Sequence, residues 1–342
     1  MSYSELRGLP LSAIVGLWVK RVSKMPHVFD HTVGRAPAQT QTKPGMHSYA
    51  AYGLCLHSDL PLEGFPSGGR TPDIFVYQRE LRIADLEQGA RGGDRLTGHF
   101  YGKLLFEVLD GRSITVHRIA EMDDEDMHAL VGGTLLTALM RQRGLLTLHA
   151  AAVTDGRQVA GFLGESGWGK STIAEAFNQQ GYEVLTDDQL VLELRDTDIL
   201  CHPGPASIKL RPESGEVLVP NFADLMQIAK RSTQRRRPVT RRQHDPLPLS
   251  RLFVLDPYDS PENVIEQLAG QESVMHLLTH SWARQTFTDS TYVSSHLKQC
   301  ARLVREVPVQ KLKRRRTLSA LGDHVSLIEA DWLAHSADHI CA

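Results

Sequence analysis

Residues 164–171 of this 342-residue chain read GESGWGKS and match the pattern G-x-x-x-x-G-K-[ST] at every fixed position. An apolar, strand-like run precedes this loop, and a helix-forming run closed by Gly181 follows it. In this context glycines let backbone N–H groups surround phosphate oxygens, and the helix N-terminus adds favourable partial charge. Lys170 is expected to hold the outer phosphates, and the Ser171 hydroxyl is expected to bind Mg²⁺. The predicted nucleotide-binding residues are Gly164, Glu165, Ser166, Gly167, Trp168, Gly169, Lys170, Ser171 and Thr172.

Two adjacent carboxylates follow only one helix later. Asp187 and Asp188 end the strand-like run YEVLT, where a carboxylate beside the loop can hold Mg²⁺. Neighbouring side chains point to opposite sides of an extended chain, so one aspartate is expected to face the metal and the other a substrate hydroxyl. The second carboxylate would accept the proton of that hydroxyl during phosphoryl transfer. The pattern does not assign the two roles, and a solvated Asp-Asp turn is the competing interpretation.

His149 is a further candidate, in the apolar run LLTLHAAAV just before the strand that leads into the loop. Because the two runs are consecutive, they are expected to be neighbours in space. The histidine could then orient the aspartate pair and tune its charge. A packed core histidine is the alternative interpretation. The candidate catalytic residues are therefore Asp187, Asp188, His149 and Lys170.

The segments LHAAAV, GESGWGKS and LTDD, at this spacing, resemble the catalytic domain of HPr kinase/phosphorylase. The resemblance covers mainly residues 146–211, with a weaker echo to Val309. It implies an α/β P-loop kinase domain of the HPr kinase/phosphoenolpyruvate carboxykinase type, preceded here by a smaller strand-rich α+β domain. It also implies ATP and Mg²⁺ as cofactors, an aspartate that activates a serine hydroxyl of a protein, and a histidine that supports this aspartate.

The segment after the aspartate pair departs from that family. HPGPASIKLRPESGE, residues 202–216, does not match the glycine-rich signature that helps to engage HPr, so HPr and the reverse phosphorylase activity are not carried over. The chain is closer to HPr kinase-like proteins of bacterial peptide-modification clusters, some of which resemble lasso-peptide tailoring kinases. Glu213 is a candidate metal ligand beside Ser171, Asp187 and Asp188, and Arg211 is a candidate phosphate or substrate contact. Ordinary surface charge is the alternative for Glu213 and Arg211.

Arginines are concentrated in one run, KRSTQRRRPVTRRQH, residues 230–244. One interpretation is a solvated loop, and the other is a clamp for an acidic acceptor or for phosphates, because guanidinium groups suit bidentate contacts. No aromatic residue interleaves the run, so nucleic acid is not an expected partner. A second run, KLKRRR at 311–316, either approaches the nucleotide or covers a surface. The candidate substrate-binding residues are Arg211, Arg235, Arg236, Arg237, Arg241 and Arg242.

The composition is that of a globular protein, with 41% hydrophobic residues, 23% charged residues and a net charge of −2. No apolar run has the length of a membrane span and no signal-peptide pattern is present, so we expect a cytoplasmic location without membrane association. The four cysteines have no metal-ligand spacing, which fits a reducing compartment. Because HPr kinases assemble, a homo-oligomer stays an open expectation.

We predict three regions in the chain. Residues 1–46 form an N-terminal extension with an amphipathic run and a Pro-containing linker. Residues 47–145 form a strand-rich domain, in which alternating apolar residues predict an antiparallel sheet with one wet face, followed by a helix at 123–143. Residues 146–342 form the HPr kinase-like catalytic domain.

The predicted function is an ATP- and Mg²⁺-dependent kinase that acts on a serine of a peptide or protein, for instance a ribosomal precursor peptide. An ordinary P-loop ATPase is one alternative, with Asp256, at the end of the apolar run SRLFVLDP, as its metal-binding acid. A non-catalytic ATP sensor that holds a partner through the N-terminal domain is another. A kinase of a small hydroxylated metabolite is the third.

Overall fold

The protein is a mixed α/β structure with two main β-sheets, a smaller one from the first part of the chain and a larger one from the rest. The computed structural model describes residues 29–30, 45–69, 71–81, 95–205, 207–229, 232–239, 245–258, 262–282 and 290–334, and every structural statement below concerns these residues. The amphipathic run predicted in the N-terminal extension lies outside them, as do Arg241 and Arg242.

Seven strands form the first sheet, in the order β1-β5-β6-β7-β4-β3-β2. They are β1 (Phe29–Asp30), β2 (His47–Ala51), β3 (Leu54–Ser58), β4 (Ile74–Gln78), β5 (Arg95–Phe100), β6 (Leu104–Leu109) and β7 (Ser113–Arg118). The pairs β5–β6 and β6–β7 are antiparallel, as the alternating sequence predicts. The pairs β3–β4 and β4–β7 are parallel, so the sheet as a whole is mixed, which the sequence did not indicate. The physical reason is the long connection, residues 59–73, which returns the chain to start β4 alongside β3.

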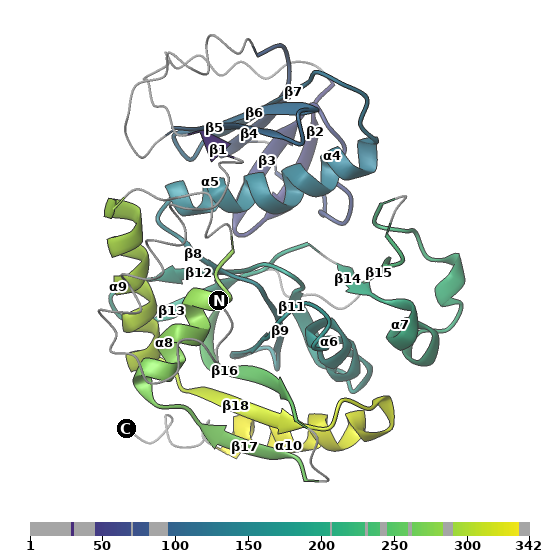
Figure 1. The fold of residues 1–342 in the computed structure, drawn as a ribbon, viewed down its shortest axis with the longest axis vertical. Helices are drawn as coiled ribbons and strands as arrows, with labels where there is room; N and C mark the ends of the chain where they lie inside the picture. The colour runs from purple at the N-terminus through teal and green to yellow at the C-terminus, as the bar shows by residue number, and fades with distance from the viewer. Residues whose placement is uncertain are drawn as a thin grey trace.

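A long helix, residues 124–142, packs against the first sheet and lies between the two sheets in Figure 1. It consists of α4 (Asp124–Leu130), the π-helical segment η1 (Val131–Leu135) and α5 (Leu136–Gln142). The predicted helix is confirmed, with Asp123 as its N-cap residue and Gly144 just past its end. The π-helical segment was not predicted, and such segments are frequent at functional sites.

Nine strands form the core sheet, in the order β11-β9-β10-β16-β13-β12-β8, with β18 paired to β16 and β17 paired to β18. They are β8 (Leu146–Leu148), β9 (Ala150–Thr154), β10 (Val159–Leu163), β11 (Glu183–Thr186), β12 (Leu190–Leu194), β13 (Ile199–His202), β16 (Leu247–Pro257), β17 (Val264–Gln267) and β18 (Val309–Arg314). Strands β10, β16 and β18 run parallel, and the other pairs are antiparallel. The core sheet is therefore also mixed.

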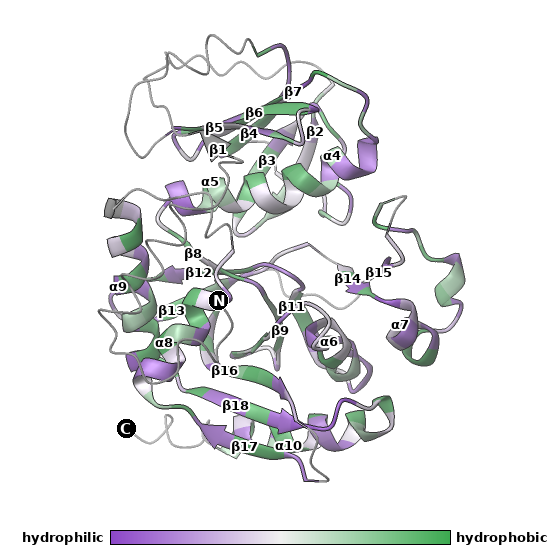
Figure 2. Ribbon diagram, in the orientation of Figure 1, coloured by the Kyte–Doolittle hydropathy of each residue, from purple (hydrophilic) through white to green (hydrophobic). Residues whose placement is uncertain are grey.

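Helices cover both faces of the core sheet, because successive side chains of a strand point to opposite faces. In β9, Ala150 and Ala152 pack with α8 (Gly270–Thr279) and α9 (Ser290–Glu306), whereas Ala151 and Val153 pack with α6 (Lys170–Gln179) and α10 (Leu321–Ala334). Figure 2 shows the consequence for hydropathy: the central strand β16 is largely apolar, and the edge strand β17 is hydrophilic.

A third, two-stranded sheet stands beside α6 in Figure 1. It pairs β14 (Ser207–Leu210) with β15 (Arg235–Pro238), and between them lie α7 (Pro212–Leu218) and the short 3₁₀ turn Phe222–Asp224. A second 3₁₀ turn, Leu318–Ala320, leads into α10. Part of the arginine run, residues 235–238, is therefore a strand paired with β14. The sequence had left open whether this run is a solvated loop.

The chain bends at two places that lie opposite each other. One bend, at His149, separates β8 from β9, and the other, at residues 187–188, separates β11 from β12. Strand pairing places Leu148 opposite Leu190 and Ala152 opposite Thr186, so the residues between them must face each other. The backbone register alone therefore brings His149 to the aspartate pair, although they are far apart in the sequence.

We predict that Gly204→Ala destabilises the fold where β11 ends. A Cβ atom at this buried position would overlap Thr186 Oγ1, the last side chain before Asp187. Overpacking of this kind lowers the free energy of unfolding by about 1–3 kcal/mol. Gly322→Ala is the matched control, because a Cβ atom there meets no atom within 4 Å and alanine favours the helix. Denaturant unfolding of both variants tests this, and equal stability of Gly204→Ala and the parent would contradict it.

Candidate active site

The glycine-rich loop, residues 164–171, connects the buried strand β10 to the helix α6. Gly167 and Gly169 have positive φ angles of 85° and 92°, which a residue with a side chain adopts only with strain. Lys170 is the first residue of α6 and is only 7% exposed. Its Nζ donates to the carbonyl oxygens of Gly164, at 2.8 Å, and Glu165, at 3.2 Å, so the lysine lies back over its own loop.

The hydroxyl of Ser171 links the loop to the first aspartate of the pair. Ser171 Oγ donates to Asp187 Oδ1 over 2.8 Å, and the other carboxylate oxygen of Asp187 accepts the backbone N–H of Lys209 over 2.7 Å. A loop hydroxyl and a carboxylate in contact are the protein ligands by which this kind of loop holds Mg²⁺. Asp187 is therefore the aspartate that faces the loop.

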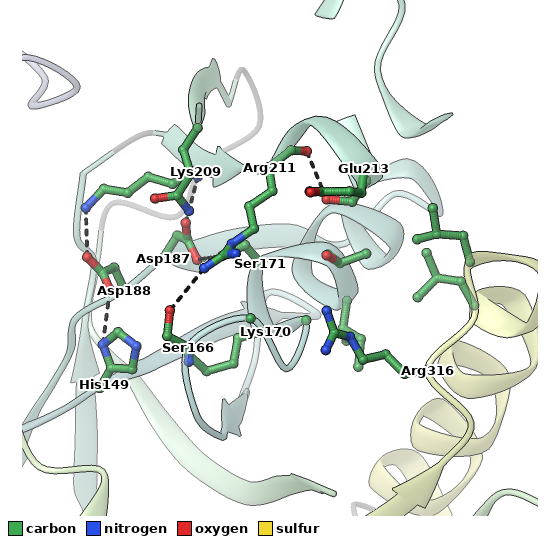
Figure 3. Close-up of a pocket in the computed structure, with 18 of the residues that line it drawn as sticks. His149, Ser166, Lys170, Ser171, Asp187, Asp188, Lys209, Arg211, Glu213 and Arg316 are labelled. Carbon is green, nitrogen blue, oxygen red and sulfur yellow. Dashed lines mark hydrogen bonds and ion pairs between the residues drawn. The ribbon is translucent and has the colours of Figure 1, made fainter. Parts of the chain in front are cut away.

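Asp188 has different partners. Its Oδ1 lies 3.1 Å from His149 Nδ1, and its Oδ2 accepts a hydrogen bond from Lys209 Nζ over 2.7 Å. Its backbone carbonyl accepts the indole N–H of Trp282 over 2.6 Å, and the Trp282 ring stands edge-on to His149 with 5.3 Å between ring centroids. Figure 3 shows the two carboxylates with separate partners, Ser171 for Asp187 and the pair His149 and Lys209 for Asp188.

The sequence predicted that the two carboxylates point apart because side chains alternate along an extended strand. The structure gives another reason. They lie in a bend after β11 and not in an extended strand. Asp188 has a φ angle of +80°, a left-handed conformation that costs a non-glycine residue free energy. The turn at Asp188, held by Trp282 and Lys209, replaces the expected alternation along a strand as the cause of the divergence.

Burial and charge act differently on the ionisable groups of the site. Burial raises the pKa of Asp187, and the neighbouring charge of Asp188 raises it further, against the hydrogen bonds from Lys209 and Ser171. Burial alone would also raise the pKa of Asp188, but Lys209 and His149 outweigh it and hold that pKa well below its usual range. Burial lowers the pKa of Lys170, while the carboxylates of Asp188 and Asp187 oppose that shift. Asp188 is thus the carboxylate that stays ionised.

A cavity of about 480 Å³ opens in front of the loop. This volume is in the range of small-molecule sites. Its lining has three exposed or partly exposed cationic side chains, Lys209, Arg211 and Arg316, and two that are buried, Lys170 and Arg314. A site with this many cations beside a glycine-rich loop fits a polyphosphate, with Ser171 and Asp187 as ligands for its Mg²⁺.

Arg211 and Glu213, for which the sequence left open a site role or ordinary surface charge, both line this cavity. Arg211 Nη2 reaches Ser166 Oγ in the loop at 3.4 Å, and Figure 3 shows its side chain extended toward Ser166. Glu213 lies in the first turn of α7, and the described residues contain no group of three or more histidine, cysteine, aspartate or glutamate side chains that could hold a metal ion. The metal role of Glu213 stays a prediction.

Three residues of this site were not recognised from the sequence. Lys209 alternates with apolar neighbours in SIKL, and this single charge in a buried strand was the available signal. Arg314, in the run KLKRRR, is 4% exposed and donates through Nη2 to the carbonyl oxygen of Trp168 in the loop. Trp282 had no signal, because it comes from a distant segment and reaches Asp188 only through the fold.

The structure separates the arginines of the 230–244 run. Arg237 Nε lies 3.0 Å from Glu175 Oε1 of α6, a glutamate with no exposure, and Arg235 donates to the carbonyl oxygen of Leu225. Arg237 therefore ties the two-stranded sheet to α6, and Arg235 ties it to the segment that connects its two strands. Arg236 points to the opposite side, as period-two alternation in a strand requires. Of the three arginines described, Arg236 alone lines a cavity beside the aspartate pair.

Asp256 ends β16 but does not line the cavity in front of the loop. It pairs in register with Lys313 of β18, whose charge it attracts. Asp187 is therefore the carboxylate placed on the loop hydroxyl, although β16 is the parallel neighbour of β10 and its end was a reasonable place to expect a metal-binding acid.

No protein-family model matches this chain, and no curated protein matches it. Among the solved structures, the Hpr(Ser) kinase/phosphatase from Coxiella burnetii matches with 12% sequence identity and a TM-score of 0.31, over 57% of this chain and 98% of that chain. Because a TM-score this low does not establish a shared fold, the function has to be inferred from the side-chain geometry. No helix in the described residues is both long enough and apolar enough to cross a membrane.

We predict that Asp187→Asn raises the Mg²⁺ concentration needed for nucleotide binding by about tenfold or more, because an amide is a weaker ligand than a carboxylate. Asp256→Asn should leave that requirement within about twofold of the parent, since Asp256 does not line the cavity. Titration of Mg²⁺ at a fixed concentration of fluorescent ATP measures both. If Asp256→Asn raised the required Mg²⁺ concentration strongly and Asp187→Asn left it unchanged, the metal would lie at the end of β16.

We also predict that Mg²⁺ binding fails before Asp188 is protonated when the pH is lowered. The pKa of Asp187 is raised and that of Asp188 is lowered, so Asp187 takes up a proton first as the pH falls. Loss of its charge weakens the metal site, and the apparent Kd for Mg²⁺ should increase on the acid side of neutrality. The same titration at several pH values tests this, and a pH-independent Kd would contradict it.

Proposed function

We propose that the protein is a Mg²⁺- and ATP-dependent kinase that transfers the γ-phosphate of ATP to a serine hydroxyl of a peptide or protein. One observation carries the proposal: two adjacent carboxylates have separate partners, Ser171 of the glycine-rich loop for Asp187 and the pair His149 and Lys209 for Asp188. A charged carboxylate beside the metal site suits a hydroxyl that must lose its proton as it attacks the γ-phosphorus, and the assay below distinguishes the hydroxyl of an acceptor from that of water.

The glycine-rich loop and its neighbours would bind the nucleotide. Backbone N–H groups of the loop and the Lys170 ammonium would hold the phosphates, and Arg211 and Arg316 would add charge from across the cavity. Ser171 and Asp187 would hold Mg²⁺, which neutralises negative charge on the phosphates when it is bound. The Lys170 side chain has only to turn from the carbonyl oxygens of its own loop toward a phosphate.

Asp188 would take the proton of the acceptor. The serine oxygen forms a bond to the γ-phosphorus, the bond from that phosphorus to the bridging oxygen of ADP breaks, and the serine proton passes to the Asp188 carboxylate. His149 and Trp282 orient Asp188 by contacts to its side chain and backbone. Lys209, 2.7 Å from the same carboxylate, keeps it ionised and brings a positive charge beside the transferring group.

The ordinary ATPase with Asp256 as its metal-binding acid has no supporting contact, because Asp256 does not line the cavity in front of the loop. A non-catalytic ATP sensor needs no ionised carboxylate at the position of Asp188. A small hydroxylated metabolite and a peptide would use the same catalytic groups. The two kinds of acceptor differ in the space that they need beside Asp188. We favour a peptide or protein for the reason given in the next section.

We predict that Asp188→Asn binds Mg·ATP with a Kd close to that of the parent but transfers phosphate about 10²- to 10⁴-fold more slowly, as for loss of a general base. Lys170→Ala should lose both ATP binding and phosphate transfer, because in this proposal Lys170 contacts the phosphates of bound ATP and those of the transition state. The assay follows labelled γ-phosphate from ATP into a pool of peptides with serine at the centre and mixed flanking residues. Release of free phosphate, with none in the peptides, would contradict the kinase proposal.

A further inference from the structure

A second cavity, of about 60 Å³, lies on the other side of the aspartate pair. It shares Asp187, Asp188, Lys209 and Ile228 with the cavity in front of the loop. No residue of the glycine-rich loop lines it, and about half of its lining comes from the segments that connect strands β2, β3 and β4 and from the helix 124–142. The cavity in front of the loop, by contrast, is lined only by residues from His149 onward.

Residues from the first part of the chain form one wall of this cavity. Gln189, the residue after the aspartate pair, is hydrogen-bonded to that wall. Gln189 is 4% exposed, and its Oε1 accepts the hydroxyl of Tyr52 over 3.0 Å, while its Nε2 donates to the carbonyl oxygen of Gly132 over 3.4 Å. Gly132 belongs to the π-helical segment, and the ring of Phe65 stands close enough to leave little space for a side chain there. The first sheet and the helix are therefore in hydrogen-bond contact with the segment that carries Asp188.

Arg236 forms the opposite wall, on the strand that pairs with Lys209. Its Nη1 donates to Ser207 Oγ over 3.0 Å, and the turn at Gly64 crosses so near that a Cβ atom there would lie 2.6 Å from Arg236 Nη1. Its Nε is buried and has no hydrogen-bond partner. An atom this enclosed is not reached from the cavity, so a molecule that enters the cavity can meet only the other N–H groups of the partly exposed Arg236 side chain.

We propose that this second cavity, the junction cavity, receives the serine side chain of the acceptor, with the Arg236 guanidinium, which lines the cavity, donating to a carbonyl oxygen of the acceptor's main chain. This inference rests on the proposed kinase function and adds the place where the acceptor binds. In-line transfer requires the hydroxyl to approach on the side of the γ-phosphate away from ADP. The junction cavity meets Asp188 from a side where no loop residue lies, which is the approach that this geometry needs.

The size of the junction cavity sets the class of acceptor. A cavity of about 60 Å³ is far below the roughly 300–1,000 Å³ of sites that enclose a whole small molecule. It admits one short side chain, and the rest of the acceptor has to stay outside. A serine in a polypeptide meets this condition, whereas the phenol ring of a tyrosine does not. The size of the cavity fits an acceptor that inserts a single hydroxymethyl group, and Arg236 on its wall fits the main chain that carries a serine.

Arg236→Lys tests the contact, because lysine keeps the positive charge and removes the planar array of guanidinium N–H donors. With the full-length protein, Mg·ATP and the serine-centred peptide pool, we expect the apparent KM for the pool to rise about tenfold, the cost of one hydrogen bond to a charged group. The kcat and the Kd for Mg·ATP should stay within about twofold of the parent. Arg195→Lys is the matched control, since Arg195 pairs with Glu193 and lines neither cavity.

Ala129→Trp is a second variant that does not disturb a buried contact, because Ala129 is exposed and lines the junction cavity. It should raise the same KM while Mg·ATP binding is unchanged. The parent should label the serine pool and not a matched tyrosine pool. An unchanged KM in both variants, or equal labelling of tyrosine, would overturn the junction cavity as acceptor site and leave the kinase proposal standing. No labelling of any pool by the parent would overturn both.

Discussion

The hydrogen bond from Ser171 Oγ to Asp187 Oδ1 joins the two parts of the site that the chain builds separately. The loop is positioned by β10 and α6, and the aspartate pair is positioned by the bend between β11 and β12. Unless these two units come together, the loop has no carboxylate for a metal, and the carboxylates have no phosphate to act on. The order of strands β11, β9 and β10 in the core sheet satisfies this requirement, because β9 separates the two by one strand only.

Charge explains why the neighbours of this bond are arranged as they are. Two adjacent carboxylates repel each other, and burial makes both more costly to ionise. Lys209 reduces this cost for both, since its backbone N–H bonds Asp187 and its ammonium bonds Asp188. The result is an unequal pair, in which one carboxylate is kept ionised and the other is protonated more readily. The contacts of the two carboxylates, and not these pKa shifts, are the basis for assigning one as base and the other as metal ligand.

The glycine-rich loop, its flanking strand and helix, and the nearness of His149 to the aspartates could be predicted from the sequence, because each depends on local pattern or on consecutive strands. The long helix was predicted for the same reason. The assignment of the two aspartates could not be, because it depends on the left-handed turn at Asp188 and on Trp282, which is 94 residues away. Parallel pairing in the first sheet and the position of Arg236 likewise depend on long-range register, which residue types alone do not encode.

A structure of the protein with Mg²⁺ and a non-hydrolysable ATP analogue tests the central claim most directly. The account predicts Mg²⁺ between the Ser171 hydroxyl and the Asp187 carboxylate, at the about 2.0–2.1 Å distances typical of this ion. It also predicts that the γ-phosphate faces Asp188, with the junction cavity on its far side. Mg²⁺ bound at Asp256, or a nucleotide bound away from the glycine-rich loop, would contradict it.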